Sequence, residues 1–325
     1  MNEKRELTRR DFVRGTACAG MGITLGMAHA TAAPARQPAK SRVVVIRDAK
    51  ALDDKSKVQT EVLPRMLDDG LKAFAGTAST QEAWKRYFQP EDKVTIKSNV
   101  MFAPTPPELV RAIMEGIATA GVAIDTIRVW DRNWGGKGPD QADPRTWDWR
   151  PGFDANSVSN AVHEATALVN VPRLMNHLLV GLGAALKNWA GAVTNINVRD
   201  KDVAFAIHGD SGAEMGMLNA IPAIRKKCRL IVVEALRPLC HGGPYVNPRY
   251  VWPYKGLVIG TDPVAVDSVC LKILQGRRDQ IRGGSWPLSP PPKHVAIAAS
   301  KYKLGTADMS KIEIVRLGWE EDAFV

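Results

Sequence analysis

Residues 93–98 (KVTIKS) and 105–120 (TPPELVRAIMEGIATA) decide the fold, because a short strand is followed within a few residues by a well-marked helix start. Thr105 can cap the helix, proline is tolerated in its first turn, and Glu108 completes a capping box. We expect this helix to end before Gly121. A strand followed by a helix is the repeating unit of a parallel sheet, so the flanking sequence is expected to repeat this order.

The same alternation continues in both directions from this stretch. Further strands are predicted at residues 43–47, 124–130, 165–171, 229–235, 256–260, 294–299 and 312–317, and further helices at 58–75, 178–192 and 262–275. The last helix opens with Asp262-Pro263, a cap followed by a proline in the first turn. This order predicts an α/β fold with a mostly parallel mixed sheet and helices on both faces. Residues 42–325 would form a single domain or two tightly joined lobes.

The N-terminus has the features of an export signal. Residues 8–14 (TRRDFVR) place two arginines before an aromatic residue, residues 15–27 are mildly apolar, and residues 28–33 (AHATAA) offer small residues for cleavage. We therefore predict a removable twin-arginine signal peptide at residues 1–32, a linker at 33–41 and a periplasmic protein. The twin-arginine translocase would be a partner during export, and the mature chain would have no membrane span. The alternative is a basic helix that stays attached.

The net charge narrows the class of partner. The chain carries a formal charge of +10, which becomes +8 when residues 1–32 leave with five basic and three acidic residues. An exported protein does not meet chromosomal DNA, so we expect no nucleic-acid partner. Anionic small molecules, cell-wall polymers and membrane surfaces are better candidates, and solubility alone is the alternative explanation.

Two other compositional features bear on function. Residues 131–153 contain four glycines, three prolines and three tryptophans, which predicts a lid or a binding loop. The predicted mature chain keeps Cys228, Cys240 and Cys270, whose spacing matches no zinc or ferredoxin pattern. Cys228 precedes a strand-like run, Cys270 lies in an apolar helix-like run, and both are expected to be core residues.

Polar side chains follow the expected strands at their carboxyl ends, where open α/β sheets bind ligands. Lysine and amide side chains in such places suit an anionic small molecule or cofactor. The predicted cofactor-binding residues are Lys97, Asn99, Asn170, Asn188 and Asp262. Asp262 could equally be a helix cap.

Two further residues are candidates for catalysis. Lys187 lies inside an apolar helical stretch, where a lysine needs a partner or a path to solvent. Asp131 follows the strand that ends at Trp130. We predict Lys187 and Asp131 as catalytic residues if the protein is an enzyme, a question that the sequence leaves open.

Histidines and one cysteine are the candidate metal ligands. In residues 240–244 (CHGGP) a thiol stands beside an imidazole on a glycine-rich turn, which could bind a soft metal or act as a nucleophile. Adjacent side chains on an extended segment point in opposite directions, so an ordinary turn is the alternative. The predicted metal ligands are His177, His208, Cys240 and His241.

Several motifs give the chain a family resemblance over residues 93–318. These are 97–99 (KSN) followed by 106–110 (PPELV), 169–174 (VNVPRL) with Asn176-His177, 185–188 (ALKN), 242–244 (GGP) and 261–267 (TDPVAVD). In them the chain resembles the domain of unknown function 362 family, some of whose members are fused to ferredoxin modules. The resemblance implies an α/β fold and a link to iron–sulfur or redox chemistry, without an established reaction. This chain has no Cys-x-x-Cys-x-x-Cys run, which argues against an iron–sulfur cluster.

Three hypotheses for function follow. The first is an exported protein that binds a metal or an anionic cofactor at the strand ends, in a redox or maturation pathway and with a redox partner. The second is a metal-independent enzyme or binding protein for an anionic cell-envelope molecule, which the positive charge and the tryptophan-rich segment favour. The third is a non-catalytic partner of another exported enzyme.

Overall fold

The computed structural model describes residues 40–131, 142–146, 157–193 and 201–325. The predicted signal peptide, nearly all of the predicted linker and much of the tryptophan-rich segment lie outside these residues. Lys40–Val325 forms one compact unit. Within the described part, no helix is both long and apolar enough to cross a bilayer.

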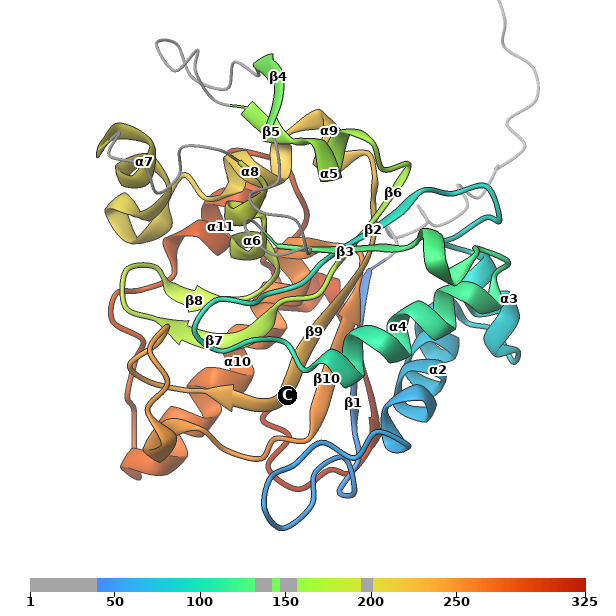
Figure 1. The fold of residues 1–325 in the computed structure, drawn as a ribbon. Helices are drawn as coiled ribbons and strands as arrows, with labels where there is room; N and C mark the ends of the chain where they lie inside the picture. The colour runs from blue at the N-terminus through green and yellow to red at the C-terminus, as the bar shows by residue number, and fades with distance from the viewer. Residues whose placement is uncertain (1–39, 132–141, 147–156, 194–200) are drawn as a thin grey trace, which may run out of the picture. The chain divides into compact units, whose positions relative to one another are not determined.

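Nine strands form one mixed sheet (Figure 1). They are β1 (Ser41–Arg47), β2 (Val94–Lys97), β3 (Arg128–Trp130), β6 (Ala167–Asn170), β7 (Arg173–His177), β8 (Gly181–Gly183), β9 (Cys228–Leu239), β10 (Gly256–Gly260) and β11 (Ile312–Gly318). The main path has the order β11-β1-β10-β9-β6-β2-β3, and β7 joins it through β9. Neighbours on this path are parallel except at β10, which is antiparallel to both β1 and β9. Two further strands, β4 (Ala142–Thr146) and β5 (Ser157–Ser159), form a separate small sheet.

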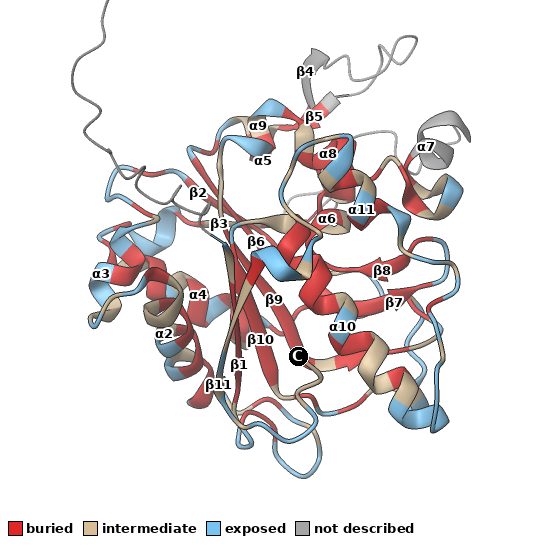
Figure 2. Ribbon diagram, turned by 180° about the vertical axis from the view of Figure 1, so that it is seen from behind, coloured by how far each residue is buried: buried red, intermediate tan, exposed pale blue. Residues whose placement is uncertain are grey.

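Helices cover both faces of the main sheet (Figures 1 and 2). One face carries α2 (Val62–Ala75), α3 (Thr80–Lys85) and α4 (Pro107–Thr119). The other carries α5 (Asn160–His163), α6 (Ala185–Asn188), α7 (Lys201–Gly212), α8 (Gly216–Ala220), α9 (Pro222–Arg225), α10 (Pro263–Arg282) and α11 (Lys293–Ser300). The predicted α/β class, with a mostly parallel mixed sheet between helices, is confirmed.

The apolar strands follow from this layering. In β1, Val43 and Val45 pack into one hydrophobic core, while Val44 and Ile46 pack into the core on the opposite face. Successive side chains of a strand point to opposite faces, so a strand that is buried on both faces must be apolar at nearly every position.

The start of α4 differs from the prediction. Its N-cap is Pro106 and no side chain caps it. The Thr105 hydroxyl instead donates to the carbonyl of Val171 (3.1 Å) and accepts the N–H of Asn99 (3.3 Å). The predicted capping box is therefore wrong, because a contact that is distant in sequence uses the hydroxyl. That contact ties the loop after β2 to the end of β6.

The helix predicted at residues 178–192 is also wrong in its first half. Residues 178–180 form a turn, β8 pairs antiparallel with β7, and only α6 and a short 3₁₀ helix (Trp189–Ala192) follow. Gly181 has a left-handed φ of 79°, and glycine weakens a helix interior in any case. The small residues that suggested close helix packing instead form a hairpin.

The strand predicted at residues 294–299 is the helix α11. Three prolines precede this helix, and its buried residues are His294, Val295 and Ala298, a spacing that places them on one helical face. A short apolar run does not distinguish a strand from a buried helix by its pattern alone.

Candidate functional site

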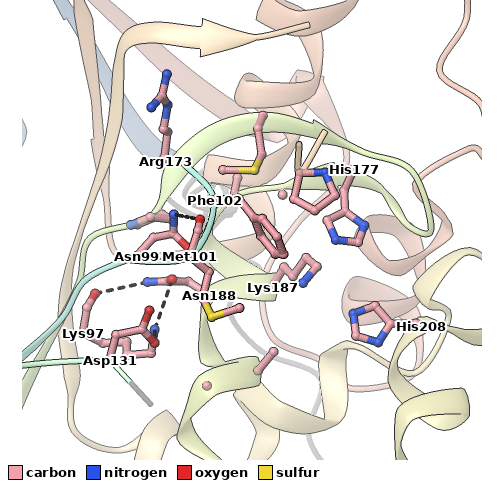
Figure 3. Close-up of a pocket in the computed structure, with 17 residues that line it drawn as sticks. Lys97, Asn99, Met101, Phe102, Asp131, Arg173, His177, Lys187, Asn188 and His208 are labelled. Atoms are coloured by element: carbon pink, nitrogen blue, oxygen red, sulfur yellow. Dashed lines mark hydrogen bonds and ion pairs between the residues drawn. The ribbon is translucent and has the colours of Figure 1, made fainter. Parts of the chain in front are cut away.

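A small cleft opens where β2, β3 and β6 end (Figure 3). It has a volume of about 190 Å³. Lys97 is the last residue of β2, Asp131 directly follows β3, and Arg173 comes three residues after Asn170, the last residue of β6. The loop before α4, the hairpin β7–β8 and α6 complete the walls. The cleft therefore lies at the carboxyl ends of parallel strands, where the sequence places a ligand site.

A buried ion pair forms one side of the cleft. Lys97 Nζ lies 2.6 Å from Asp131 Oδ1, and the two side chains are only 2% and 4% exposed. The ammonium also donates to the carbonyl of Ser98 (2.7 Å), and Asp131 Oδ2 accepts the N–H of Val100 (2.9 Å). Both charges are thus held in fixed positions away from bulk water.

Gly191 provides the space for this pair. A Cβ atom at Gly191 would lie 2.6 Å from Asp131 Oδ1 and 3.1 Å from Lys97 Cε. Both distances are below a normal van der Waals contact, so a side chain here would displace the carboxylate. Gly191 also lines the cleft.

Two asparagines hold the ion pair against α6. Asn188 Nδ2 donates to the carbonyl of Lys97 (3.1 Å) and to Asn170 Oδ1 (2.7 Å), and its Oδ1 accepts from Lys97 Nζ (3.3 Å). Asn170 Nδ2 donates to the carbonyl of Ala185 (2.9 Å). Asn188 lines the cleft, whereas Asn170 is fully buried behind it and orients Asn188.

Asn99 shapes the loop that borders the cleft. Its Nδ2 donates to the carbonyls of Ala103 (2.7 Å) and Met101 (3.3 Å). The side chain lines the cleft, so Asn99 both borders the ligand space and fixes the loop between β2 and α4.

His177, Lys187 and His208 form the opposite side of the cleft (Figure 3). The two imidazole rings stack, with centroids 5.7 Å apart and planes at 21°. Burial, and next the positive charge of Lys187, lower the pKa of His177 to about 2. Its Nδ1 accepts the N–H of Leu179 (3.2 Å), so the neutral ring carries its proton on Nε2.

Arg173 is a cleft residue that the sequence analysis missed. Its Nε lies 3.3 Å from Glu234 Oε2, and its Nη2 donates to the carbonyl of Arg237 (2.5 Å). Arg173 follows Pro172 just beyond the end of β6, so the rule that selected Asn170 could also have selected it. Gly191 gave no such signal, because its importance depends on side chains far away in sequence.

Asp262, in contrast, lies away from the cleft. Its Oδ1 caps α10 by accepting the N–H of Val264 and of Ala265, both at 2.9 Å. Its Oδ2 accepts from Ser41 Oγ (2.7 Å) and from the N–H of Thr306 (3.0 Å). The strand before it, β10, is antiparallel to β9, so its carboxyl end lies at the opposite end of the sheet from those of β2 and β6. The placement of Asp262 with the other strand-end residues was therefore wrong, and its alternative as a helix cap is confirmed.

The four predicted metal ligands lie in two places. His177 and His208 are in the cleft, whereas His241 packs against Tyr250 and Trp286 with its Nδ1 3.2 Å from Arg278 Nη1. No group of three or more His, Cys, Asp and Glu residues in the described parts of the chain is arranged to hold a metal ion.

The three cysteines that the structure describes are buried or partly buried free thiols. Burial raises the pKa of the Cys240 thiol, and burial raises that of Cys270 well above its ordinary value. A nucleophilic cysteine must be a thiolate, so Cys240 is poorly suited to that role. Cys270 is fully buried and Cys228 packs against the same core, as predicted.

The structure thus brings together seven of the eleven predicted site residues. The residues that line the cleft are Lys97, Asn99, Asp131, His177, Lys187, Asn188 and His208.

Comparison with known proteins gives one family match. A family model described as a domain of unknown function, number 362, matches residues 139–272. This stretch includes Arg173, His177, Lys187 and His208 but not the Lys97–Asp131 pair. A search of curated proteins finds no match to the chain.

Proposed function

Because the chain belongs to the domain of unknown function 362 family, whose description names no reaction, we propose a function from the cleft itself. The protein binds a small anionic ligand or cofactor at the carboxyl ends of β2, β3 and β6. It does so as an exported, periplasmic protein in a redox or maturation pathway.

The charge of the cleft carries this proposal. Among the described residues that line it are three cations, Lys97, Arg173 and Lys187, and one carboxylate, that of Asp131. Arg173 also pairs with the buried Glu234, which lies behind the lining, so three positive charges stand against two negative ones. An excess of fixed positive charge in a partly enclosed site concentrates and binds anions. Neutral His177 adds an Nε2–H donor, and Asn188 an amide.

The size of the cleft limits the group that it can hold. A cavity of roughly 150 Å³ accommodates benzene, so the 190 Å³ here suit a carboxylate, a phosphate or a group of similar size. A polymer would not enter. The cleft therefore favours a small molecule or the end group of a larger one.

The same side chains could also act on a bound anion. Lys187 places an ammonium group near the neutral imidazole of His177, and both groups can donate a hydrogen bond to a bound anion. Asp131 is held by Lys97 and by a backbone N–H, so its carboxylate is fixed in direction. Lys187 and Asp131 thus remain the candidate catalytic residues.

Export supports a cofactor as the ligand. The twin-arginine route carries folded proteins, so a ligand bound in the cytoplasm could cross the membrane inside the folded chain. The twin-arginine translocase and a redox partner are the macromolecular partners in this proposal. A metal ion is a less suitable ligand than an anionic cofactor, because the cations of the cleft would repel it.

Titration of the purified protein with phosphate and with acetate, followed by calorimetry, tests the proposal. Lys187→Gln should weaken binding of the preferred anion by about 10- to 100-fold, since a hydrogen bond to a charged group contributes roughly 1.5–3 kcal/mol. Lys272→Gln is the matched control, because it removes the same charge from an exposed position on α10. Equal affinities in the two variants, or no saturable binding of either anion, would contradict the proposal.

A further inference from the structure

The mouth of the cleft is surrounded by exposed apolar side chains. Among the described residues, eight large apolar side chains are at least 42% exposed, and six of them lie on three loops beside the cleft. We call these six the apolar rim: Met101, Phe102, Leu178, Leu179, Tyr245 and Val246. Scattered exposed apolar residues need no explanation, but a cluster around a cavity marks a binding surface.

Direct contacts join the three loops of the apolar rim. The rings of Phe102 and Tyr245 meet edge to face with centroids 4.9 Å apart. The N–H of Leu178 donates to the carbonyl of Gly243 (2.7 Å), which connects the β7–β8 turn to the loop that carries Tyr245. Met101 and Phe102 also line the cleft itself, so the rim continues into the anion site (Figure 3).

Phe102 is held in an unfavourable state by its surroundings. Its φ of 59° lies in the left-handed region, which is rare for a bulky residue. The N–H of Ala103 donates to the carbonyl of Met101 (2.6 Å), on the other side of Phe102. The Asn99 amide donates to the carbonyls of both Met101 and Ala103. The ring is 50% exposed, so neither backbone geometry nor burial favours Phe102 here. Strain of this kind is concentrated at ligand-binding sites.

We infer that the ligand is an amphiphile, with a small anionic group in the cleft and an apolar chain or ring against the apolar rim. This inference rests on the proposed function. The cleft is too small to enclose more than the anionic group, so the remainder of a larger ligand must pass out across Met101 and Phe102. The cations inside the cleft adjoin the apolar rim at its mouth, and this arrangement fits one amphiphilic molecule. A membrane surface or a partner protein on the rim is an outcome of the test below.

A series of alkyl phosphates tests the inference, with inorganic phosphate as its shortest member and all ligands kept below micelle formation. Each methylene that reaches the rim should tighten binding up to about fourfold, from the transfer free energy of a buried CH₂. Phe102→Gly should flatten this dependence on chain length. Glycine accepts the left-handed φ, so this variant should fold.

Two further variants separate the possible outcomes. Tyr245→Ser should flatten the series in the same way. Ile281→Ser, which removes an exposed apolar side chain from α10, should not. Binding of phosphate with no dependence on chain length would overturn the inference and leave the proposed function standing. Failure of inorganic phosphate and all alkyl phosphates to bind would overturn both. If Phe102→Gly leaves the series unchanged but abolishes cosedimentation with anionic phospholipid vesicles, the rim is a membrane surface and the inference is wrong.

Discussion

The Lys97–Asp131 pair can be tested by removing each charge alone and both together. The variants are Lys97→Met, Asp131→Asn and the double variant, and the quantity is the free energy of unfolding. At 2.6 Å and an effective dielectric constant of 20, the attraction between the two charges is about 6 kcal/mol. Desolvation of two nearly buried ions offsets much of this, so the pair contributes little compared with an apolar pair of the same size.

Loss of one partner is a different matter, because the other charge stays buried without compensation. Breaking a buried pair costs roughly 3–5 kcal/mol. We expect Lys97→Met to reach this range, since the carboxylate would keep the Val100 N–H as its described contact. Asp131→Asn should cost less, because the ammonium keeps the oxygen atoms of Ser98 and Asn188.

The double variant measures the coupling between the two charges. It removes both buried charges, so its cost should fall short of the sum of the single variants by about 2 kcal/mol or more, within the range of measured couplings. Urea unfolding, followed by the fluorescence of the buried tryptophans, measures all four proteins. Additivity within about 0.5 kcal/mol, or a cost below about 1 kcal/mol for Lys97→Met, would refute the picture of a desolvated pair.

Two more predictions concern residues around the cleft. Gly191→Ala should lower the unfolding free energy by about 1–3 kcal/mol and weaken anion binding, because its Cβ would press on Asp131. Urea unfolding measures the first effect and calorimetry the second. No change in either would show that the Lys97–Asp131 pair can move aside. Burial lowers the pKa of His294 to about 4 from 6.5, so the unfolded chain takes up a proton that the folded chain does not as the pH falls from 6.5 to 4. The neutral His294 side chain therefore costs the folded state nothing above pH 6.5. As the pH falls from 6.5 to 4, the free energy of unfolding decreases by about 3 kcal/mol. His294→Leu should make the pH dependence of the urea midpoint shallower, and identical slopes would argue against a neutral buried imidazole.

The sequence predicted the layers of the fold well and their connections less well. Strands such as 256–260 are apolar throughout and are bounded by glycine, so their positions are a local property. The direction of β10 is not local, because it depends on which strands lie beside it. The error over Asp262 followed from that direction alone. The errors at 178–192 and 294–299 have a different cause, since short runs of small and apolar residues fit a strand or a helix equally well.

The candidate site shows the same division between local and distant information. Lys97, Asp131 and Asn170 could be selected because each follows a strand that is parallel to the others. Arg173 lies close to the same strand end, but Val171 and Pro172 separate it from β6 and it is the first residue of β7. The apolar rim could not be predicted, because its three loops meet only through contacts between residues that are far apart in sequence.

The helix α6 explains how two unlike halves of the cleft keep their spacing. Its neighbouring residues Lys187 and Asn188 face different sides, one beside His177 and the other on the Lys97 ammonium. The first two N–H groups of α6 donate to the buried Asp267 carboxylate, at 2.7 and 3.1 Å. A four-residue helix has little stability of its own, so this anchor and the Asn170 amide must fix it. The cation that we expect to contact the ligand is therefore positioned by residues that never reach the cleft, and changes at Asp267 should alter ligand affinity through α6.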